Sequence, residues 1–297
     1  MLVGCTASGK SALAFELARR LPDVELVSMD SMQVYRGMDI GTAKPGPGPR
    51  AEVPHHLIDL VDPSHDFTMA EFQAAARDVL AGIEERGHRG LLVGGTGLYV
   101  RAVTDRLEPP GRFPAVVAEL EREPDTAVLH QRLRQLDPVA AARMLPGNRR
   151  RVVRALEVTL GSGRPFSSFG PGLGAYPNTP FRMAGLWLPR AVVSQRIADR
   201  FDAMVSAGLV AEVEGLARGP GGLSRTARQA LGYREVLLHA EEGHPLERCL
   251  HEAVRRTRAF ARRQRVWWRR DPRLTWFGAA GNPLAVAPAL LEHWREP

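Results

Sequence analysis

The hydrophobic positions of the first hundred residues form short apolar runs separated by stretches with helical spacing. Two of these runs predict buried strands, at residues 24–30 and 91–94, and residues 53–63 contain a further short strand. Two stretches predict helices, at residues 11–20 and 68–86. Strands that alternate with helices in this way favour an α/β fold with an open parallel sheet. A further apolar run, Leu2-Val3, is shorter than an ordinary strand, so we expect the first strand to be incomplete.

After residue 107 the pattern changes. A break at Pro109-Pro110-Gly111 precedes four stretches with helical spacing, at residues 115–122, 126–136, 138–144 and 149–160. A loop rich in Gly and Pro covers residues 161–180. Later apolar runs predict strands at residues 183–188 and 274–277, and helical spacing recurs at residues 192–207, 210–217 and 251–270. We therefore predict a sheet core formed by residues 1–107 and 190–297, interrupted by an all-helical insertion domain at residues 108–189.

An eight-residue motif after the first apolar run carries the strongest chemical signal. It reads Gly4-Cys5-Thr6-Ala7-Ser8-Gly9-Lys10-Ser11 and fits the phosphate-loop pattern G-x-x-x-x-G-K-[ST]. Its glycines let backbone N–H groups point inward, Lys10 reaches an outer phosphate, and the Ser11 hydroxyl can hold Mg²⁺. We expect a P-loop NTPase-like parallel sheet flanked by helices. The loop predicts a bound di- or triphosphate but does not identify the group attached to it.

Polar residues follow two of the predicted strands. Asp30 ends the strand at residues 24–30, and Thr96 lies in the glycine turn after residues 91–94. Open parallel sheets bind their ligands at the carboxyl ends of the strands. We therefore expect both side chains on the same rim as the phosphate loop. Residues 30–45 are polar and rich in turn-forming residues, which predicts a binding loop.

The composition is that of an ordinary globular protein. The chain has 297 residues, 44% hydrophobic and 25% charged, enough to bury a core in one large domain or two. No apolar run is long enough to span a bilayer, and the phosphate loop leaves no room for a signal peptide, so we expect a cytoplasmic protein without a membrane partner. Cys5 and Cys249 form neither a metal-ligand spacing nor a disulfide framework. His55, His56 and Asp59 lack a third ligand at useful spacing, so we expect packed or capping histidines.

The charge is basic and is carried by arginine. The formal net charge is +7, and every basic residue except Lys10 and Lys44 is an arginine. In the helix predicted at residues 251–270, arginines recur at spacings of three and four: Arg255, Arg258, Arg262, Arg265 and Arg269. Like charges at this spacing repel, and Glu252 is the only acidic residue in the stretch, so we expect an anionic partner. A second basic group at residues 149–154 predicts a long polyanion lying across both domains.

Seven ordered motifs follow the phosphate loop. They are D-S-M-Q-V-Y-R-G-M-D-I-G-T-A-K-P from Asp30, H-H-L-I-D from His55, G-G-T-G-L-Y from Gly94, R-V-V-R-A-L-E-V from Arg151, Q-R-I-A-D-R-F from Gln195, A-L-G-Y-R from Ala230 and R-R-Q-R-V-W-W from Arg262. Together they resemble the bacterial tRNA dimethylallyltransferases (tRNA isopentenyltransferases) over nearly the whole chain. The resemblance implies transfer of a dimethylallyl group from dimethylallyl diphosphate to the exocyclic N6 amine of an adenosine next to the tRNA anticodon. The products would be N6-isopentenyladenosine and diphosphate.

The resemblance also implies a role for individual residues. Asp30 would be the base for the adenine amine, Thr96 would lie near that adenine, and Lys10 and Arg200 would assist the diphosphate. The diphosphate would lie on the loop residues Gly4, Cys5, Thr6, Ala7, Ser8, Gly9, Lys10 and Ser11, with Mg²⁺ on Ser11. Contacts to the tRNA anticodon stem-loop are implied for Asp30, Ser31, Met32, Gln33, Thr96, Arg150, Arg151, Arg154, Gln229, Gly232, Arg234, Arg262, Arg263, Gln264 and Arg265. We expect a monomer.

The sequence departs from the family pattern at three points. Cys5 stands where the family usually has proline, which leaves the N–H cradle intact and adds an oxidisable thiol. Asn148 stands where an aspartate is frequent, which puts a contact from that carboxylate in doubt. The cysteines of the zinc finger found in eukaryotic members are absent.

Two other functions remain open from the residues alone. A small-molecule kinase would use the phosphate loop, with an acidic residue at the second strand's end to accept a hydroxyl proton. It leaves both arginine groups unexplained. An RNA-dependent NTPase or binding module accounts for the arginines, but the chain lacks a recognisable acidic pair for activating water and any helicase-like motif.

Overall fold

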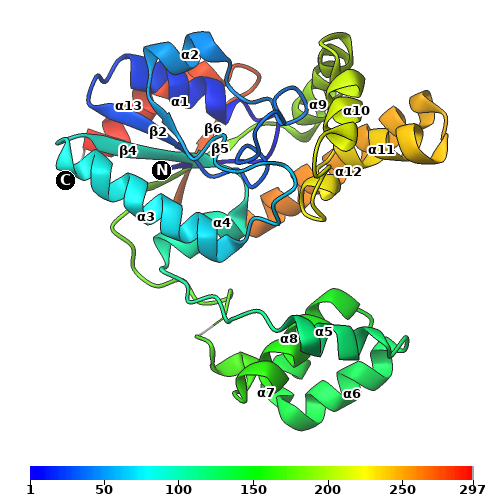
Figure 1. The fold of residues 1–297 in the computed structure, drawn as a ribbon. Helices are drawn as coiled ribbons and strands as arrows, with labels where there is room; N and C mark the ends of the chain where they lie inside the picture. The colour runs from blue at the N-terminus through cyan, green and yellow to red at the C-terminus, as the bar shows by residue number, and fades with distance from the viewer. Residues whose placement is uncertain (171, 296–297) are drawn as a thin grey trace. The chain divides into compact units, whose positions relative to one another are not determined.

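The computed structural model describes residues 1–170 and 172–295 and divides into two compact units (Figure 1). The core unit contains Met1–Thr104 and Asn178–Pro297, and the insertion unit contains Asp105–Pro177. The insertion therefore ends at Pro177, and not at residue 189 as predicted. The predicted boundary was too late because residues 183–187 form a central strand of the core sheet.

The core unit is built on a six-stranded parallel sheet in the order β3-β2-β4-β1-β5-β6. Its strands are β1 (Leu2–Val3), β2 (Val24–Ser28), β3 (His55–His56), β4 (Arg89–Gly94), β5 (Met183–Trp187) and β6 (Leu274–Gly278). Leu2 of β1 is paired with Val93 on one side and Ala184 on the other. Helices cover both faces of the central strands, so their apolar runs are nearly continuous rather than alternating. The predicted α/β class is confirmed.

Helices flank the sheet on both faces (Figure 1). They are α1 (Lys10–Arg19), α2 (Pro47–Glu52), α3 (Met69–Glu85), α4 (Gly97–Thr104), the short 3-10 helix η3 (Pro283–Val286) and α13 (Ala287–Arg295). α1 and α13 pack together on one face, and α3 packs with α4 on the other. α3 begins where the sequence predicts because Thr68 and Glu71 form a reciprocal capping box.

Four more helices lie beyond the carboxyl ends of the strands (Figure 1). They are α9 (Arg190–Ser206), α10 (Leu209–Arg218), α11 (Tyr233–Glu242) and α12 (Leu246–Trp268), with the 3-10 helix η2 (Ala227–Gln229) before α11. α12 packs on α9 and α11 and buries Ala253, Thr257, Ala261 and Trp268. Within residues 1–170 and 172–295, no helix is both long and apolar enough to cross a membrane.

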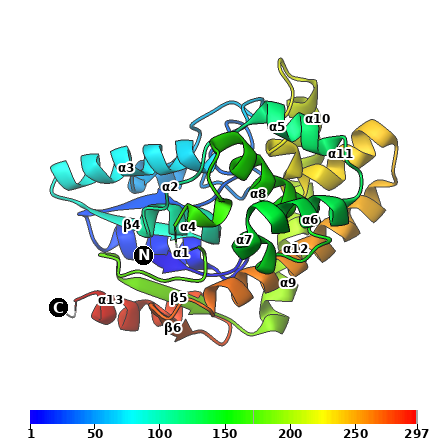
Figure 2. The same cartoon turned by 90° about the horizontal axis from the view of Figure 1, so that it is seen from below.

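The insertion unit is a small bundle with its own core (Figure 2). Its helices are α5 (Pro114–Glu121), α6 (Thr126–Leu136), α7 (Pro138–Ala142), α8 (Arg149–Ser162) and the 3-10 helix η1 (Phe166–Ser168). Leu133 and Val152 are fully buried between α6 and α8. Arg149 donates to the Glu123 carbonyl at 2.6 Å and to the Pro124 carbonyl at 3.2 Å, so it holds the chain after α5 instead of projecting into solvent.

Candidate active site

The phosphate loop connects the central strand β1 to the first turn of α1. Gly9 has φ +86° and is the N-cap of α1, and Ala7 also adopts a left-handed conformation, with φ +59°. The Ser8 N–H donates to the Cys5 carbonyl at 3.2 Å and closes the turn. A Cβ on Gly4 would lie 2.9 Å from Ser8 Oγ, so the backbone can curl this tightly only at a glycine. The sequence has folded into a compact turn ending at a helix N-terminus, the usual geometry of a phosphate cradle.

Two cations and one carboxylate interact electrostatically beside this loop. The Arg200 guanidinium on α9 donates to Thr6 Oγ1 at 2.9 Å. Burial lowers the pKa of both Lys10 and Arg200. The negative charge of Asp30 opposes this shift but does not cancel it. The buried Arg200 Nε has no hydrogen-bond partner among the described residues. A bound anion would supply that missing partner and relieve the cost of placing two cations together.

The Gln264 side chain on α12 is part of this loop's support. The Thr6 N–H donates to its Oε1 at 2.7 Å, and its Nε2 donates to the Gly95 carbonyl at 2.9 Å. Gln264 is buried and both ends of its carboxamide are bonded within the protein, whereas the tRNA contact implied for it stays a prediction. Its place in a basic motif suggested RNA, whereas its packing joins the phosphate loop to the end of β4.

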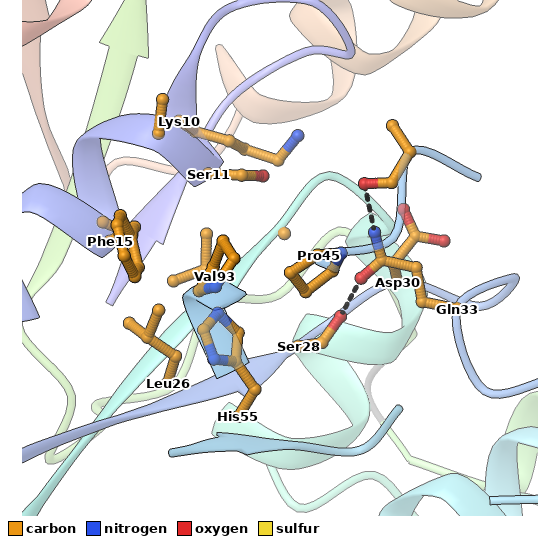
Figure 3. A pocket seen from close by; sticks show the side chains of 15 residues that line it. Lys10, Ser11, Phe15, Leu26, Ser28, Asp30, Gln33, Pro45, His55 and Val93 are labelled. Carbon is orange, nitrogen blue, oxygen red and sulfur yellow. Dashed lines mark hydrogen bonds between the residues drawn. The ribbon is translucent and has the colours of Figure 1, made fainter. Parts of the chain in front are cut away.

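A cavity of about 250 Å³ opens beside the loop (Figure 3). Lys10, Ser11 and Asp30 line its polar end. The remaining wall is mainly apolar and is formed by Phe15, Leu26, Pro45, Pro49, Val93 and neighbouring small residues, with His55 at its edge. The cavity therefore joins a phosphate-binding end to a space that fits a short apolar group.

Asp30 lies on the predicted rim, just after β2, with its side chain half-buried. Its Oδ1 accepts a hydrogen bond from the Met32 N–H at 2.9 Å, the only bond that the structure gives this carboxylate within the described residues. Gln33 also faces the cavity and accepts from Ser28 Oγ at 2.8 Å (Figure 3). Ser31 and Met32 are half-buried beside them. Asp30 thus keeps acceptor capacity for a substrate proton.

Thr96 follows β4 and precedes α4, between two glycines that neighbouring side chains touch. A Cβ on Gly95 would lie 2.5 Å from Gln264 Nε2, and one on Gly97 would lie 2.1 Å from Trp267 Nε1. These close approaches explain why the turn is glycine-rich. They place Thr96 next to α12, although Thr96 is not among the residues that line the cavity.

Ser11 and Asp30 fit a magnesium site that the ligand itself would complete. Both side chains line the polar end of the cavity. Mg²⁺ usually keeps several waters and binds one or two protein oxygens together with substrate phosphates, so a full protein cage is not required. Among the described residues, no group of three or more His, Cys, Asp or Glu side chains could hold a metal. His56 instead bonds Glu25 at 2.5 Å, and His55 bonds the Val53 carbonyl at 2.7 Å.

The arginines of α12 do not form one exposed stripe as predicted. Arg265 is buried, donates to the Leu188 carbonyl at 2.9 Å and lies 3.7 Å from the Trp187 ring centroid. Arg258 donates to the Ser194 carbonyl at 3.3 Å. α12 packs against the core on these sides, and the long apolar stem of arginine lets it point inward. Their predicted roles on an RNA-facing surface are therefore corrected.

Two of the predicted tRNA contacts, Arg262 and Arg263, are exposed on α12, and Arg270, just after this helix, is exposed as well. A shallow groove of about 410 Å³ is lined by Ala259, Arg262, Arg263, Val266, Trp267 and Arg270. The three arginines are exposed, and none forms an ion pair with a described residue. Val266 is 53% exposed, and Arg263 lies over the Phe260 ring. Cations alternating with apolar and aromatic side chains suit a nucleic-acid strand.

The predicted tRNA contacts near α11 also include both exposed and buried residues. Gln229 and Arg234 are exposed, whereas Gly232 is buried and its N–H donates to Glu235 Oε2 at 2.9 Å. The role of Gly232 is therefore structural. It begins α11 with φ +89°, a conformation that favours glycine.

In the insertion unit, Arg150 and Arg151 are exposed. Arg154 pairs with the buried Glu157 at 2.7 Å and donates to the Pro110 carbonyl, so much of its bonding capacity is used internally. The side chain of Asn148, where the family often has aspartate, caps α8 by accepting from the Arg151 N–H at 3.4 Å. The substitution therefore keeps a helix-capping oxygen at this position.

A phosphate cradle at the end of a parallel sheet, a facing carboxylate and a small apolar cavity define an enzyme of the P-loop class. A profile of the IPP transferase family matches residues 33–271. The chain belongs to this family, and it is a transferase. The two functions left open by the residues, a kinase and an RNA-dependent NTPase, are not favoured by this result.

Relatives of known function and solved structures are similar to this protein over nearly the whole chain. The tRNA dimethylallyltransferase of Salinispora arenicola is 50% identical, covering 97% of this chain and 84% of its own. That of Geobacter metallireducens is 45% identical, covering 94% and 92%. The tRNA isopentenylpyrophosphate transferase of Bacillus halodurans superposes with a TM-score of 0.70 at 36% identity, over 98% of this chain and 95% of its own. A eukaryotic dimethylallyltransferase described as acting on tRNA gives 0.79 at 25% identity, over 100% and 79%.

Proposed function

We propose that this protein transfers a dimethylallyl group from dimethylallyl diphosphate to the N6 amine of an adenosine next to the tRNA anticodon, releasing diphosphate. One observation carries the proposal: Lys10 and Ser11, the last residues of the phosphate loop, line a cavity together with Asp30, and the remaining wall of that cavity is mainly apolar. A five-carbon allylic diphosphate has this same division into an anionic end and an apolar end. Family membership supports the same reaction.

The leaving group must be neutralised for the allylic carbon–oxygen bond to break. The loop N–H groups, Lys10 and Arg200 carry the positive charge that would stabilise diphosphate as this bond breaks. Ser11 would hold Mg²⁺, with Asp30 nearby, and the ion would add further neutralising charge to the diphosphate. Because the cavity wall is apolar, water that could otherwise hydrolyse the donor would be excluded.

The acceptor amine is a poor nucleophile because its lone pair is delocalised into the adenine ring. Asp30 would accept the amine proton as the new carbon–nitrogen bond forms. The carboxylate lines the cavity, is half-buried, and interacts electrostatically with Lys10 and Arg200. An adenine held in a loop stack must first be extruded to reach the base.

Exposed arginines in both units support an RNA substrate. Arg262, Arg263 and Arg270 flank the groove on α12, and Arg150 and Arg151 project from α8. We propose that the tRNA anticodon stem-loop contacts both surfaces, that a monomer suffices for this, and that the tRNA substrate places the enzyme in the cytoplasm. Salt-dependent binding would follow from the phosphate contacts.

The test is to incubate the protein with labelled dimethylallyl diphosphate, Mg²⁺ and bulk tRNA, and to follow label into RNA. We expect label in tRNA, dependence on the donor, and no product when ATP replaces the donor. ATP turnover stimulated by small alcohols, with no label entering RNA, would support a kinase instead.

A further inference from the structure

We propose that Glu212 on α10 is a positioning residue, which fixes the loop at residues 38–44 and through it the part of the cavity wall formed by Ser28, Gln33 and Ala43. Its Oε2 accepts hydrogen bonds from the Asp39 N–H at 3.0 Å and the Ile40 N–H at 2.7 Å. Its Oε1 accepts from the Gly41 N–H at 3.1 Å and from the Tyr233 hydroxyl. One carboxylate from the last third of the chain thus holds three successive amides of the first third.

The geometry requires a carboxylate rather than an amide. Successive N–H groups that converge on one point form a small anion-binding concavity, and here an internal side chain occupies it. Each Glu212 oxygen accepts two hydrogen bonds, which uses the full acceptor capacity of the group. In Glu212→Gln, an NH₂ group would replace one oxygen and point its donors at donors.

A close backbone approach makes this contact specific. A Cβ on Gly41 would lie 2.3 Å from Tyr233 Cε2, so the loop can pack on this ring only with glycine at position 41. Tyr233 is fully buried in α11, and burial together with its bond to Glu212 raises the pKa of its hydroxyl. The hydroxyl therefore stays protonated and donates to Glu212 at every physiological pH.

The held loop continues directly into the cavity wall. The Thr42 and Ala43 carbonyls accept from Gln33 Nε2 at 3.2 and 3.4 Å, and Gln33 Oε1 accepts from Ser28 Oγ at 2.8 Å. Ser28, Gln33 and Ala43 line the cavity together with Asp30 (Figure 3). Glu212 does not line the cavity, so it acts through these residues.

A second anchor holds the other end of the loop from within the first third of the chain. The buried Lys44 Nζ donates to the Tyr35 carbonyl at 2.7 Å and pairs with Asp39 and Asp59. Lys44 fixes the loop to its own neighbourhood, whereas Glu212 fixes it to α10 and α11. Tyr233 belongs to the motif A-L-G-Y-R, for which the family resemblance implies contacts with tRNA. Its hydrogen bond to Glu212 gives this motif a second role, in positioning the cavity wall.

The inference can be tested in the free enzyme by hydrogen exchange, without any assumption about the reaction. In Glu212→Gln and Glu212→Ala, we expect the Asp39, Ile40 and Gly41 amides to exchange at least about tenfold faster, while β4 amides stay protected. Glu214→Ala is the matched control, because Glu214 lies on the same helix and pairs with the exposed Arg218. Unchanged exchange at these three amides in Glu212→Gln would overturn the proposal.

The kinetic part of the test rests on the proposed function. At saturating tRNA and dimethylallyl diphosphate, the single-turnover rate of prenyl transfer should fall roughly 10- to 100-fold in Glu212→Gln, because a small displacement of positioning groups is enough for such a loss. Both dissociation constants should stay within about threefold of wild type. Tyr233→Phe removes only one of the hydrogen bonds to Glu212, so its rate of prenyl transfer should fall less than that of Glu212→Gln. An unchanged rate in Glu212→Gln, or an equal loss in Glu214→Ala, would overturn the positioning role, whereas failure of wild type to transfer label would overturn the proposed function.

Discussion

Gln264 and Thr6 are joined by a hydrogen bond of 2.7 Å between the Gln264 carboxamide oxygen and the Thr6 N–H. Residues far apart in the sequence thus meet at the phosphate loop, and one loop N–H is bound by protein rather than left for a ligand. The carboxamide nitrogen bonds Gly95 as well, so one buried side chain fixes both the cradle and the turn before Thr96.

We expect Gln264→Ala to weaken dimethylallyl diphosphate binding about 5- to 30-fold, because the ligand must then order a loop that Gln264 no longer holds, at a cost on the scale of one hydrogen bond, about 1–2 kcal/mol. Calorimetric titration with the diphosphate measures this effect. Gln195→Ala, which removes an exposed glutamine of α9 bonded to Asp199, should leave the affinity unchanged. Weaker tRNA binding with an intact diphosphate affinity would instead support an RNA-binding role for Gln264.

The exposed arginines of α12 should control RNA affinity and its salt dependence. For the triple variant Arg262→Ala, Arg263→Ala, Arg270→Ala, we expect the slope of log affinity against log salt to fall by about 0.7 to 0.9 for each RNA phosphate that the protein no longer neutralises. Diphosphate affinity should stay near that of wild type. Fluorescence anisotropy with labelled tRNA at several salt concentrations gives the slope.

The control removes the same net charge elsewhere. Arg19, Arg20 and Arg89 pair with acidic side chains on the core surface, and their replacement by alanine should leave the slope nearly unchanged. If both triple variants behave alike, the groove on α12 has no particular role and only the overall charge matters.

Glu25 should make stability depend on pH in the acidic range. Arg86, His56 and His88 bond this buried carboxylate, and the Arg86 bond above all lowers its pKa from 4.5 to about 2. A carboxyl group with a lower pKa in the folded state stabilises the fold fully above pH 4.5, and this contribution is lost as pH falls toward 2. The difference in unfolding free energy between wild type and Glu25→Gln should therefore shrink as pH falls from about 4.5 toward 2. Urea unfolding at each pH measures it, and a difference that does not change between about pH 6 and 3 would contradict this account.

The sequence predicts the parts of the site that depend on local pattern. The phosphate loop is a contiguous motif, and Asp30 follows from the rule that strand ends converge on one rim. Arg265 was misplaced because helical spacing gives the same weight to every arginine, while the neighbours that cover one side of α12 come from β5 and the residue after it. The bonds of Glu212 to residues 39–41 were missed because nothing local in the sequence links these positions. α11 was missed because its first turn depends on Gly232 at positive φ and a cap from Glu235.

The central claim is that Asp30 accepts the proton of the adenine amine. Its carboxylate accepts one hydrogen bond from a described residue, the Met32 N–H, so Asp30→Ala should fold normally. Asp23→Ala, which removes an exposed carboxylate paired with Arg89, is the control and should transfer the prenyl group at the wild-type rate.

The most direct measurement is the single-turnover rate of prenyl transfer by Asp30→Ala at saturating tRNA and dimethylallyl diphosphate, over a range of Mg²⁺ concentrations. Loss of a general base predicts a rate roughly 10²- to 10⁴-fold below wild type at every Mg²⁺ concentration, with both substrates bound nearly as before. A rate that returns close to wild type at saturating Mg²⁺ and tRNA would contradict the account and would leave Asp30 with a role in holding the metal alone.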